Sequence, residues 1–244
     1  MQSIEVKVLN PEQLDSSEKM MVAMARLTQP SHKISCMDDF IELLNKPYSP
    51  STAETMTKLP HPTIQKFGLI NIAIVGASRR FLAQITRHQN EIKFMSGSLQ
   101  YSDYSDDMQF CVPYEVTKYD REHPELGGKW ALQQYTNSCL QSMDDYRKAA
   151  KLIGNDAAGY MAPQGMRNVL LMSVLPYELK HIISQRGCNR NTLETQYVLL
   201  KIWEQLYDYP MFKDCGPDCM GQGCREGKMA CGRPMQKGMT PTDI

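Results

Sequence analysis

The feature that most constrains the fold is the apolar run FGLINIAIV at residues 67–75. The run is rich in β-branched side chains, which favour strands, and it is apolar on both alternating faces. A strand with two apolar faces is typical of the interior of a covered sheet. We therefore expect a central strand that is buried on both sides. One face carries Ile70, Ile72 and Ile74, and the other carries Leu69, Ala73 and Val75.

Elsewhere, apolar residues recur mostly every three or four positions, which is the period of an amphipathic helix. An alternating segment at residues 4–8 predicts another strand, and residues 46–62 and 119–128 have the composition of connections. The sequence therefore predicts an α+β fold: a single helix-rich domain with a central antiparallel or mixed sheet. The predicted helices span residues 15–29, 37–45, 79–89, 130–153, 167–186 with a break at Leu175-Pro176, and 192–207.

Composition narrows the domain organisation and the partners. The chain has 244 residues, and we expect residues 1–209 to form one domain on which a Cys/Gly-rich tail at residues 210–244 packs. Lys plus Arg and Asp plus Glu both total 27, with no long basic run, which argues against a nucleic acid partner. No apolar run approaches the roughly eighteen residues of a membrane span, and the N-terminus does not resemble a signal peptide. We therefore expect a cytoplasmic protein with reduced cysteines.

A cationic and amide face is predicted on the helix at residues 79–89. Arg80, Gln84, Arg87 and His88 are spaced so that they project from roughly one side. This face leads into the small residues at 96–98, whose backbone N–H groups are accessible to oxygen atoms of a ligand. The pattern indicates an anion-binding site, although a solvated helix face followed by a turn explains it equally well.

A second arginine lies at the end of an apolar helical stripe. Arg186 follows Leu179, Ile182 and Ile183 on one face, where an uncompensated charge is costly, so it favours an anionic or oxygen-rich ligand. Arg190 stands four residues before Glu194, and a helix ion pair between them is the simplest interpretation.

The tail carries half of the eight cysteines: Cys215, Cys219, Cys224 and Cys231. Their spacings are not the paired C-x2-C pattern of familiar zinc sites. We therefore expect no metal and favour reduced thiols in tight glycine-rich turns, with metal or cluster binding as the alternative. Cys188 has no evident histidine partner and is interpreted as a packing residue.

Three blocks in this order resemble the flavin-dependent thymidylate synthase family. Arg87-His88-Gln89, followed by Ser98-Leu99-Gln100-Tyr101, is similar to the family's Arg-His-Arg run and its later Ser-x-Arg-Tyr. The segment RGCNR at residues 186–190 is similar to the second arginine block of the family. The cysteine-containing tail also resembles the end of some members, so the resemblance covers the chain from about residue 60 onward.

The resemblance implies reductive methylation of dUMP to dTMP with methylenetetrahydrofolate and reduced FAD, with NADPH as reductant, in a homotetramer whose catalytic domain is residues 1–209. It implies that Arg186 lies against the uracil and stabilises negative charge on the ring. The residues implied to contact FAD are Arg87, His88, Gln89, Arg190 and Thr63. The residues implied to bind the nucleotide are Gln84, Arg87, Ser98, Leu99, Gln100, Arg167 and Arg186.

The chain departs from the family pattern where substrate is held. Gln89 and Gln100 replace two arginines, and a third family arginine falls near Gly159, so Arg167 is the hypothetical substitute. These departures leave open a related flavin-dependent pyrimidine nucleotide hydroxymethylase, or a nucleotide-binding protein without catalysis.

Overall fold

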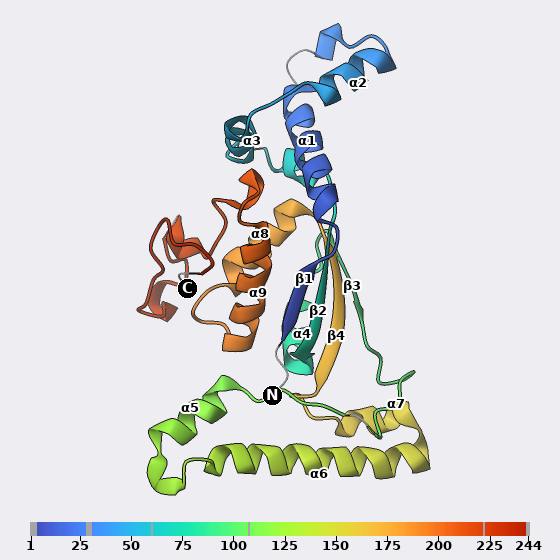
Figure 1. Ribbon diagram of the computed structural model, residues 1–244, viewed down its shortest axis with the longest axis vertical. Coiled ribbons are helices and arrows are strands. Elements are labelled where there is room, and N and C mark those ends of the chain that lie inside the picture. Colours follow the sequence, from blue (N-terminus) through green and yellow to red (C-terminus); the bar gives the residue numbers. More distant parts are fainter. Residues whose placement is uncertain (1–3, 28–30, 60, 107, 222, 243–244) are drawn as a thin grey trace. The chain divides into compact units, whose positions relative to one another are not determined.

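The computed structural model describes residues 4–27, 31–59, 61–106, 108–221 and 223–242 (Figure 1). It contains one four-stranded antiparallel sheet with strand order β1-β2-β4-β3, and helices are in the majority, so the predicted α+β class is confirmed. The strands are β1 (Glu5–Val8), β2 (Ile70–Ser78), β3 (Ile92–Ser96) and β4 (Arg167–Val174). The α-helices are α1 (Pro11–Leu27), α2 (Met37–Asn45), α3 (Pro50–Thr57), α4 (Arg79–Ile85), α5 (Tyr114–Glu122), α6 (Trp130–Ile153), α7 (Asn155–Ala158), α8 (Pro176–Arg186) and α9 (Leu193–Leu206).

The chain divides into two compact units. Unit 1 consists mainly of Ile74–Arg87 and Phe94–Leu171. Unit 2 consists of Val6–Ala73, His88–Lys93 and Met172–Ile244, so the whole cysteine-rich tail belongs to it. The prediction of one catalytic domain with a tail packed on it stays a prediction.

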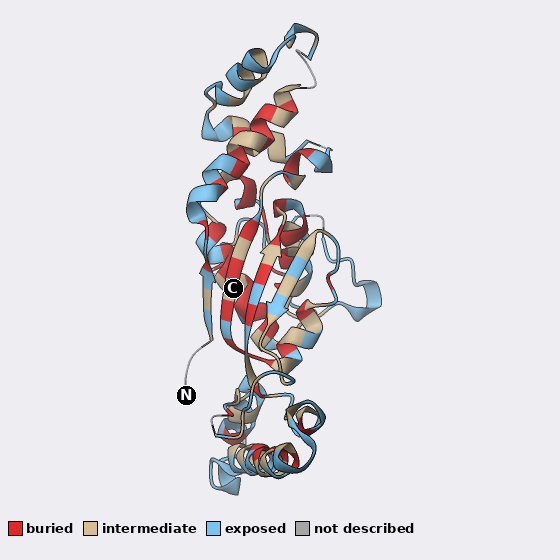
Figure 2. Ribbon diagram, turned by 90° about the vertical axis from the view of Figure 1, so that its right-hand side faces the viewer, coloured by how far each residue is buried: buried red, intermediate tan, exposed pale blue. Residues whose placement is uncertain are grey.

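Strand β2 is fully buried on one face and only partly buried on the other. Ile70, Ile72 and Ile74 have no exposed surface, as predicted, whereas on the second side Ala77 is buried but Val75 and the preceding Leu69 are 40% and 44% exposed. The prediction of a strand buried on both faces is therefore wrong for the second face, which the described chain covers only in part. Figure 2 shows buried residues alternating with more exposed ones along the strands.

In unit 2, helices α1, α8 and α9 all contribute buried apolar residues to the core. The apolar stripe of α9 includes Trp203, whose indole N–H donates to the carbonyl of Phe212 at 3.0 Å. Both side chains are fully buried. The Gln205 side chain of α9 also bonds to the backbone of β1, accepting from the N–H of Val8 and donating to the carbonyl of Val6. These bonds hold α9 beside β1. Helices α8 and α9 also pack against each other.

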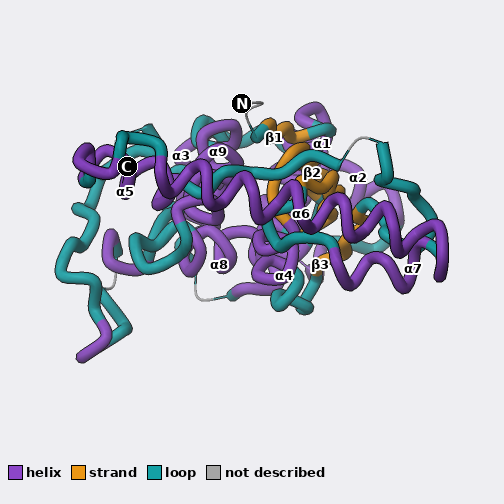
Figure 3. Tube along the Cα trace, turned by 90° about the horizontal axis from the view of Figure 1, so that it is seen from below, coloured by secondary structure: helices purple, strands orange, loops and turns teal. Residues whose placement is uncertain are grey.

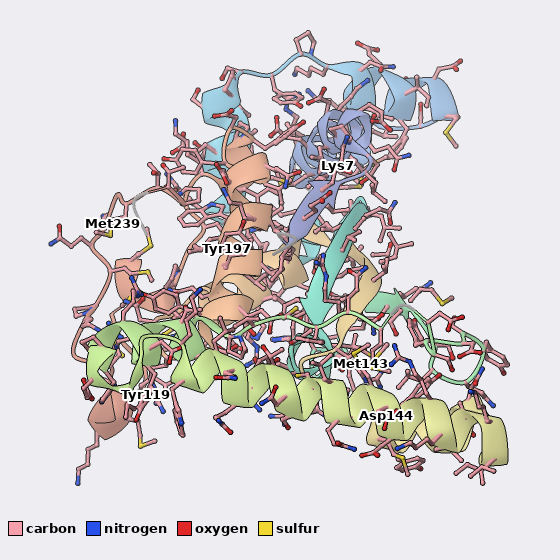
Figure 4. All side chains as sticks on the ribbon, turned by 60° about the horizontal axis from the view of Figure 1, so that its bottom comes forward. Lys7, Tyr119, Met143, Asp144, Tyr197 and Met239 are labelled. Carbon is pink, nitrogen blue, oxygen red and sulfur yellow. The ribbon has the colours of Figure 1, made fainter. Side chains whose placement is uncertain are left out.

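In unit 1, the long helix α6 has the predicted bounds and runs unbroken in Figure 3. Met143 and Tyr146 are buried in a cluster with residues from other segments of unit 1. Asp144, one position along, instead pairs with Lys148 on the exposed face. Figure 4 shows Met143 and Asp144 on different sides of the helix, so α6 is amphipathic as its period of three to four residues indicates.

The helix predicted at residues 167–186 is confirmed only in its second part. Residues 167–174 were predicted to be helical but form β4, because Leu170, Met172 and Val174 are buried at a period of two. The predicted break at Leu175-Pro176 marks the start of α8, since proline is favourable in the first turn of a helix.

Helix boundaries also differ from the predictions. Helix α1 begins at Pro11, four residues before its predicted start at residue 15, so Ser17, which donates to the carbonyl of Gln13, and buried Glu18, which accepts from Tyr48, both lie inside it. Helix α4 ends at Ile85, so the predicted helix at residues 79–89 is shorter than expected. Helix α3 forms within the predicted connection at residues 46–62, and α5 overlaps the start of the one predicted at residues 119–128.

The residues at the start of α3 explain why a helix forms here. The Ser49 side chain accepts from the N–H of Thr52, and Pro50 occupies the first helical position. In the described ranges, no helix is long and apolar enough to cross a membrane.

Candidate functional site

The predicted site residues fall into two groups, one in each unit. The structure places the first group, which includes most of the expected nucleotide contacts, in unit 1: Gln84, Arg87, Ser98, Leu99, Gln100 and Arg167. It places the second group, which includes the expected catalytic arginine, in unit 2: Thr63, His88, Gln89, Arg186 and Arg190.

The centre of the unit 2 group is a hydrogen bond between two predicted residues. Arg186, the last residue of α8, donates from Nε to Nε2 of His88 at 2.9 Å, across 98 positions of sequence. Its Nη1 donates to Oδ1 of Asn191 at 3.3 Å. Arg186 is half-buried and His88 is buried. The fold therefore holds the Arg186 guanidinium in a defined orientation.

The burial of His88 sets its protonation state. Burial, together with the charges of Arg186 and His181, lowers the pKa of His88 to about 4, so the ring is neutral near pH 7. A guanidinium only donates hydrogen bonds, so Nε2 accepts and the proton of the neutral ring lies on Nδ1. The positive charge of the pair therefore resides on Arg186.

A buried carboxyl group that the sequence did not single out lies on the other side of the ring. Oε1 of Glu178, in the first turn of α8, is 3.7 Å from Nδ1 of His88, the nitrogen that carries the proton. Burial raises the pKa of Glu178. The only sequence signal for its role is an acidic residue at the start of a helix that ends in Arg186.

The segment after Arg186 is held by amide side chains. Asn191 donates to the carbonyl of Gln185 at 2.7 Å, and buried Gln196 donates to the carbonyl of Gly187 at 3.0 Å and to Oδ1 of Asn189 at 2.9 Å. This network fixes residues 187–191 in a non-helical path between α8 and α9. The sequence motif RGCNR is therefore a structured loop.

Arg190 belongs to this loop and does not form the helix ion pair first expected. It precedes α9, and its Nη1 lies 2.5 Å from Oε2 of Glu226 in the tail. Gln89 and Thr63, the other two expected flavin contacts of unit 2, are both exposed.

A cavity of about 580 Å³ opens between this loop and the tail. Its walls are residues 184–186 and 188–191 on one side, and tail residues within 218–234 on the other. Arg186 and Arg190 both line it, so the two arginines of the second motif share one space.

In unit 1, the residues around Ser98 form a turn at the end of β3. The Ser98 hydroxyl accepts from the backbone N–H groups of Gln100 at 3.1 Å and Tyr101 at 3.3 Å. The Gln100 side chain is exposed, whereas Leu99 packs against the cluster that contains Tyr146. Leu99 therefore anchors the turn and leaves Gln100 free to face a ligand.

The other part of the unit 1 group, at residues 74–87, contains Gln84 and Arg87. Helix α4 starts at Ser78, whose hydroxyl accepts from the N–H of Phe81 at 3.0 Å. Gln84 is half-buried near its end. Arg87 follows the end of the helix and is exposed.

Arg167 is the first residue of β4, next in the sheet to β3. Its guanidinium lies over Gly76, where a Cβ would collide with Nη2 and where φ is +87°. The positive φ therefore favours glycine at 76, and an added Cβ would also displace the Arg167 guanidinium.

An unpaired donor lies beside Arg167. The Nδ2 group of Asn168 is buried and has no hydrogen-bond partner among the described residues. Its Oδ1 accepts from the N–H of Val169, and a Cβ on Gly97 would lie 2.8 Å from the same oxygen. Gly97 N–H in turn donates to the carbonyl of Val169 at 3.0 Å, so Asn168 adjoins the turn that carries Ser98. An unsatisfied buried amide favours an oxygen-bearing ligand.

Comparisons with known proteins agree on one family. A model of the family described as thymidylate synthase complementing protein, Thy1, matches residues 11–209. A flavin-dependent thymidylate synthase from Thermococcus onnurineus is 26% identical over 179 residues, which is 69% of each chain. One from Geobacter sulfurreducens is 22% identical over 202 residues, covering 81% of this chain and 82% of that protein.

Solved structures show the same fold at lower identity. Thymidylate synthase X from Helicobacter pylori, solved with FAD and dUMP, has a TM-score of 0.61 and 18% identity, and the match covers 87% of this chain and 99% of that chain. The UMP/dUMP methylase PolB from Streptomyces cacaoi, bound with 5-Br dUMP, has a TM-score of 0.64 and 13% identity over 87% of this chain and 94% of that one.

Proposed function

The chain belongs to the Thy1 family of thymidylate synthase complementing proteins, and from this premise we propose that it makes dTMP by reductive methylation of dUMP. The carbon donor is methylenetetrahydrofolate, the cofactor is FAD, and NADPH is the reductant. The curated relatives with this activity support the proposal at 22% and 26% identity. The observation that carries it is the Arg186–His88 hydrogen bond, which joins the two motif blocks of the family resemblance.

Arg186 is proposed to be the catalytic residue. Its Nε and Nη1 are bonded to His88 and Asn191, so the guanidinium needs little reorganisation when negative charge develops on the pyrimidine ring. The neutral His88 accepts a hydrogen bond without cancelling the charge of Arg186. A fixed cation of this kind stabilises the transition state more than the substrate, and no enzyme nucleophile is required.

The residues of unit 2 fit a flavin by the chemistry of their donors. Thr63 and Gln89 are exposed hydroxyl and amide donors, and Arg190 lines the cavity beside Arg186. We propose that these three, with His88 and Arg87, hold FAD. When bound, the reduced flavin supplies the hydride that completes the methyl group. This chain's own part is to bind the ring, orient it and present Arg186.

The residues of unit 1 fit a nucleotide monophosphate. Arg87 and Arg167 supply positive charge, Ser98 and Gln100 supply neutral polar groups, and the orphaned Nδ2 of Asn168 is a further donor. We propose that these residues bind dUMP together with Gln84 and the backbone at Leu99. Arg167 takes the role of the arginine that the family places near residue 159.

The Arg167 assignment is tested by affinity. Arg167→Ala should weaken dUMP binding by roughly 10- to 100-fold, because a charge-assisted hydrogen bond contributes about 1.5–3 kcal/mol. Isothermal calorimetry gives the dissociation constant, with Arg121→Ala as control, since Arg121 is exposed on α5 and belongs to neither group of site residues. An unchanged dissociation constant in Arg167→Ala removes Arg167 from the site.

A second candidate is a flavin-dependent hydroxymethylase that acts on a pyrimidine nucleotide. The observation that favours it is the exchange of two family arginines for Gln89 and Gln100, both of which are exposed where a ligand is expected. One structural neighbour is described as a methylase of both UMP and dUMP, which supports a different activity within this fold.

One experiment separates these candidates from simple nucleotide binding. The purified protein is examined for a flavin absorption spectrum and then incubated with dUMP, methylenetetrahydrofolate and NADPH, and the product is identified by mass. We expect bound flavin and dTMP. A product heavier than dTMP by one oxygen atom favours the hydroxymethylase, and the absence of both flavin and product refutes the enzyme.

We also propose that the protein is a homotetramer. In unit 1, the second face of the sheet carries Val75, Val169 and Leu171, which are 40%, 54% and 41% exposed. Apolar side chains left open in this way are covered when copies associate. Light scattering during size-exclusion chromatography measures the mass, and a monomer at micromolar concentration contradicts the proposal.

A further inference from the structure

Four cysteines line the cavity between the Arg186–Arg190 loop and the tail: Cys188, Cys219, Cys224 and Cys231. All four are free thiols, and Cys188 lies within electrostatic range of the other three. Cys215, the remaining cysteine of the tail, is different: it is buried, and its thiol faces the carbonyl of Lys180. Cys188 was interpreted from the sequence as a packing residue, but in the structure it faces the tail cysteines across a shared cavity.

Three of the four sulfur atoms accept a backbone hydrogen bond. The N–H of Arg190 donates to Cys188, and the N–H of Arg233 donates to Cys231 at 3.3 Å, so both bonds come from two residues further along the chain. The N–H of Met235 donates to Cys219 at 3.3 Å. Backbone donors aimed at sulfur stabilise a thiolate, and such bonds support the ligands of metal centres bound by cysteine.

The charges around the cavity match such a centre. Arg186, Arg190, Arg225 and Arg233 line it together with Asp218 and Glu226, which leaves an excess of two positive charges. A divalent ion bound by four thiolates carries two negative charges. The lining of the cavity therefore compensates the charge of a tetrathiolate centre.

The part of the tail that carries Cys224 and Cys231 buries almost no surface, although Phe212 and Met235 on either side of it are buried. In residues 221 and 223–234, every described residue is exposed except Cys231, which is half-buried. Its described ties to the rest of unit 2 are few and polar, such as the Arg190–Glu226 ion pair and a 2.9 Å bond from Asn189 to the carbonyl of Arg233. A segment that buries so little surface usually depends on a disulfide or a metal ion for a defined conformation.

We propose that Cys188, Cys219, Cys224 and Cys231 form a structural Zn²⁺ site that ties the tail to the Arg186–Arg190 loop. Four thiolates and no open position are typical of a structural zinc site. Within the described ranges, no three His, Cys, Asp or Glu side chains are gathered closely enough to hold a metal ion. Binding therefore requires the four thiols to turn into the cavity until each sulfur lies about 2.3 Å from the ion.

The site has a consequence for the loop. Cys188 lies between Arg186 and Arg190 in the chain, and all three line the cavity. Zinc bound at Cys188 restrains both arginines, so it positions them without contacting substrate. This consequence rests on the proposed function, whereas zinc binding itself does not.

The first test is metal content. The protein is purified under reducing conditions with Zn²⁺ and dialysed. Bound metal is then measured by inductively coupled plasma mass spectrometry. We expect about one zinc per chain. X-ray absorption should show sulfur ligands at about 2.3 Å. No zinc, zinc bound through nitrogen or oxygen, or iron with labile sulfide in its place overturns the proposal.

The second test locates the ligands. The double variant Cys219→Ser/Cys231→Ser should lose the bound zinc, whereas Cys36→Ser should keep it, because Cys36 is an exposed thiol at the start of α2 and outside the cavity. Circular dichroism shows whether each variant folds. Zinc retained by a folded double variant refutes the assignment.

A third measurement needs no variant. Alkylation of the wild-type protein with N-ethylmaleimide, with and without chelator, is mapped by mass spectrometry of peptides. Zinc should protect Cys188, Cys219, Cys224 and Cys231 at least tenfold and leave Cys36 equally reactive in both samples. Equal alkylation of all five thiols contradicts the site even where the double variant does not fold. If the wild-type protein binds zinc but forms no dTMP, the result counts against the proposed function and leaves the zinc site standing.

Discussion

The two groups of site residues differ in how their polar side chains are held. In unit 2, half-buried Arg186 and buried His88 are bonded to each other. In unit 1, Arg87 and Gln100 are exposed, and the local bonds around Ser98 come from backbone groups. The charge proposed to be catalytic is thus partly buried and held by side-chain bonds, whereas the groups expected to hold the nucleotide are more exposed.

This difference explains where the chain departs from its family pattern. Gln89 and Gln100, which replace arginines, are both exposed, so neither exchange leaves a buried group without a partner. A change at His88 or Arg186 would leave a buried polar group unsatisfied, at a cost of about 1–3 kcal/mol. Exposed substrate contacts can therefore vary while the buried pair is retained.

Replacing Arg186 should have the largest effect on activity. Arg186→Ala removes the fixed cation, and kcat should fall on the order of 10³-fold with flavin content unchanged. Steady-state formation of dTMP measures the rate, and flavin absorbance measures cofactor content. Arg186→Lys is the matched control, because it keeps the charge but not the fork of donors. Full turnover in Arg186→Ala would show that the buried pair does not serve catalysis.

Replacing Gly76 should have the largest effect on stability. Gly76→Ala places a Cβ against the Arg167 guanidinium at a φ of +87°, and should lower the free energy of unfolding by about 1–3 kcal/mol. Chemical denaturation measures it. Gly127→Ala is the control, because Gly127 has a similar φ of +89° and nothing within 4 Å of its added Cβ. Equal losses in both variants would mean that backbone strain alone, and not Arg167, requires glycine at 76.

Restoring the family arginine should sharpen the contrast between the groups. Gln100→Arg adds a charged donor at an exposed position, so dUMP should bind roughly 10-fold more tightly, since a charge-assisted bond exceeds a neutral one by about 1 kcal/mol or more. Stability should change little, because the side chain makes no buried contact. Calorimetry measures the affinity, and weaker binding in Gln100→Arg would place Gln100 away from the phosphate.

The smallest predicted effect is a dependence of stability on pH. Burial lowers the pKa of His88 from 6.5 to about 4, so its contribution to stability is present above pH 6.5 and is lost as the pH falls toward 4. Glu178, whose raised pKa has the opposite sign, contributes below about pH 4.5 and loses its contribution as the pH rises. His181 and Arg186 also face the His88 ring, and both are present in the wild type and in the His88→Gln variant described next.

His88→Gln isolates the histidine term, because glutamine accepts a hydrogen bond from Arg186 and does not titrate. Denaturation between pH 4 and 7 should show a flatter slope for the variant than for the wild type. Identical slopes would show that His88 does not titrate between its folded and unfolded values in this range.

Local sequence was sufficient for elements whose pattern is long and regular. The helix at residues 130–153 was predicted with its observed bounds because its apolar period continues for 24 residues and Gly154 ends it. Short segments were harder: residues 167–174 were predicted as helix and are strand β4, because eight residues do not separate a period of two from one of 3.6. The resemblance to the family, in contrast, was visible from the motif residues and their order along the chain.

The sequence by itself determined the α+β class, the long helix and the two motif blocks that indicate the family. Only the tertiary structure decided that His88 is neutral and bonded to Arg186, that Arg190 pairs with Glu226, and that Cys188 faces the tail cysteines. The physical reason is that propensity and periodicity act between near neighbours, whereas protonation, pairing and the lining of a cavity depend on residues brought together from distant parts of the chain.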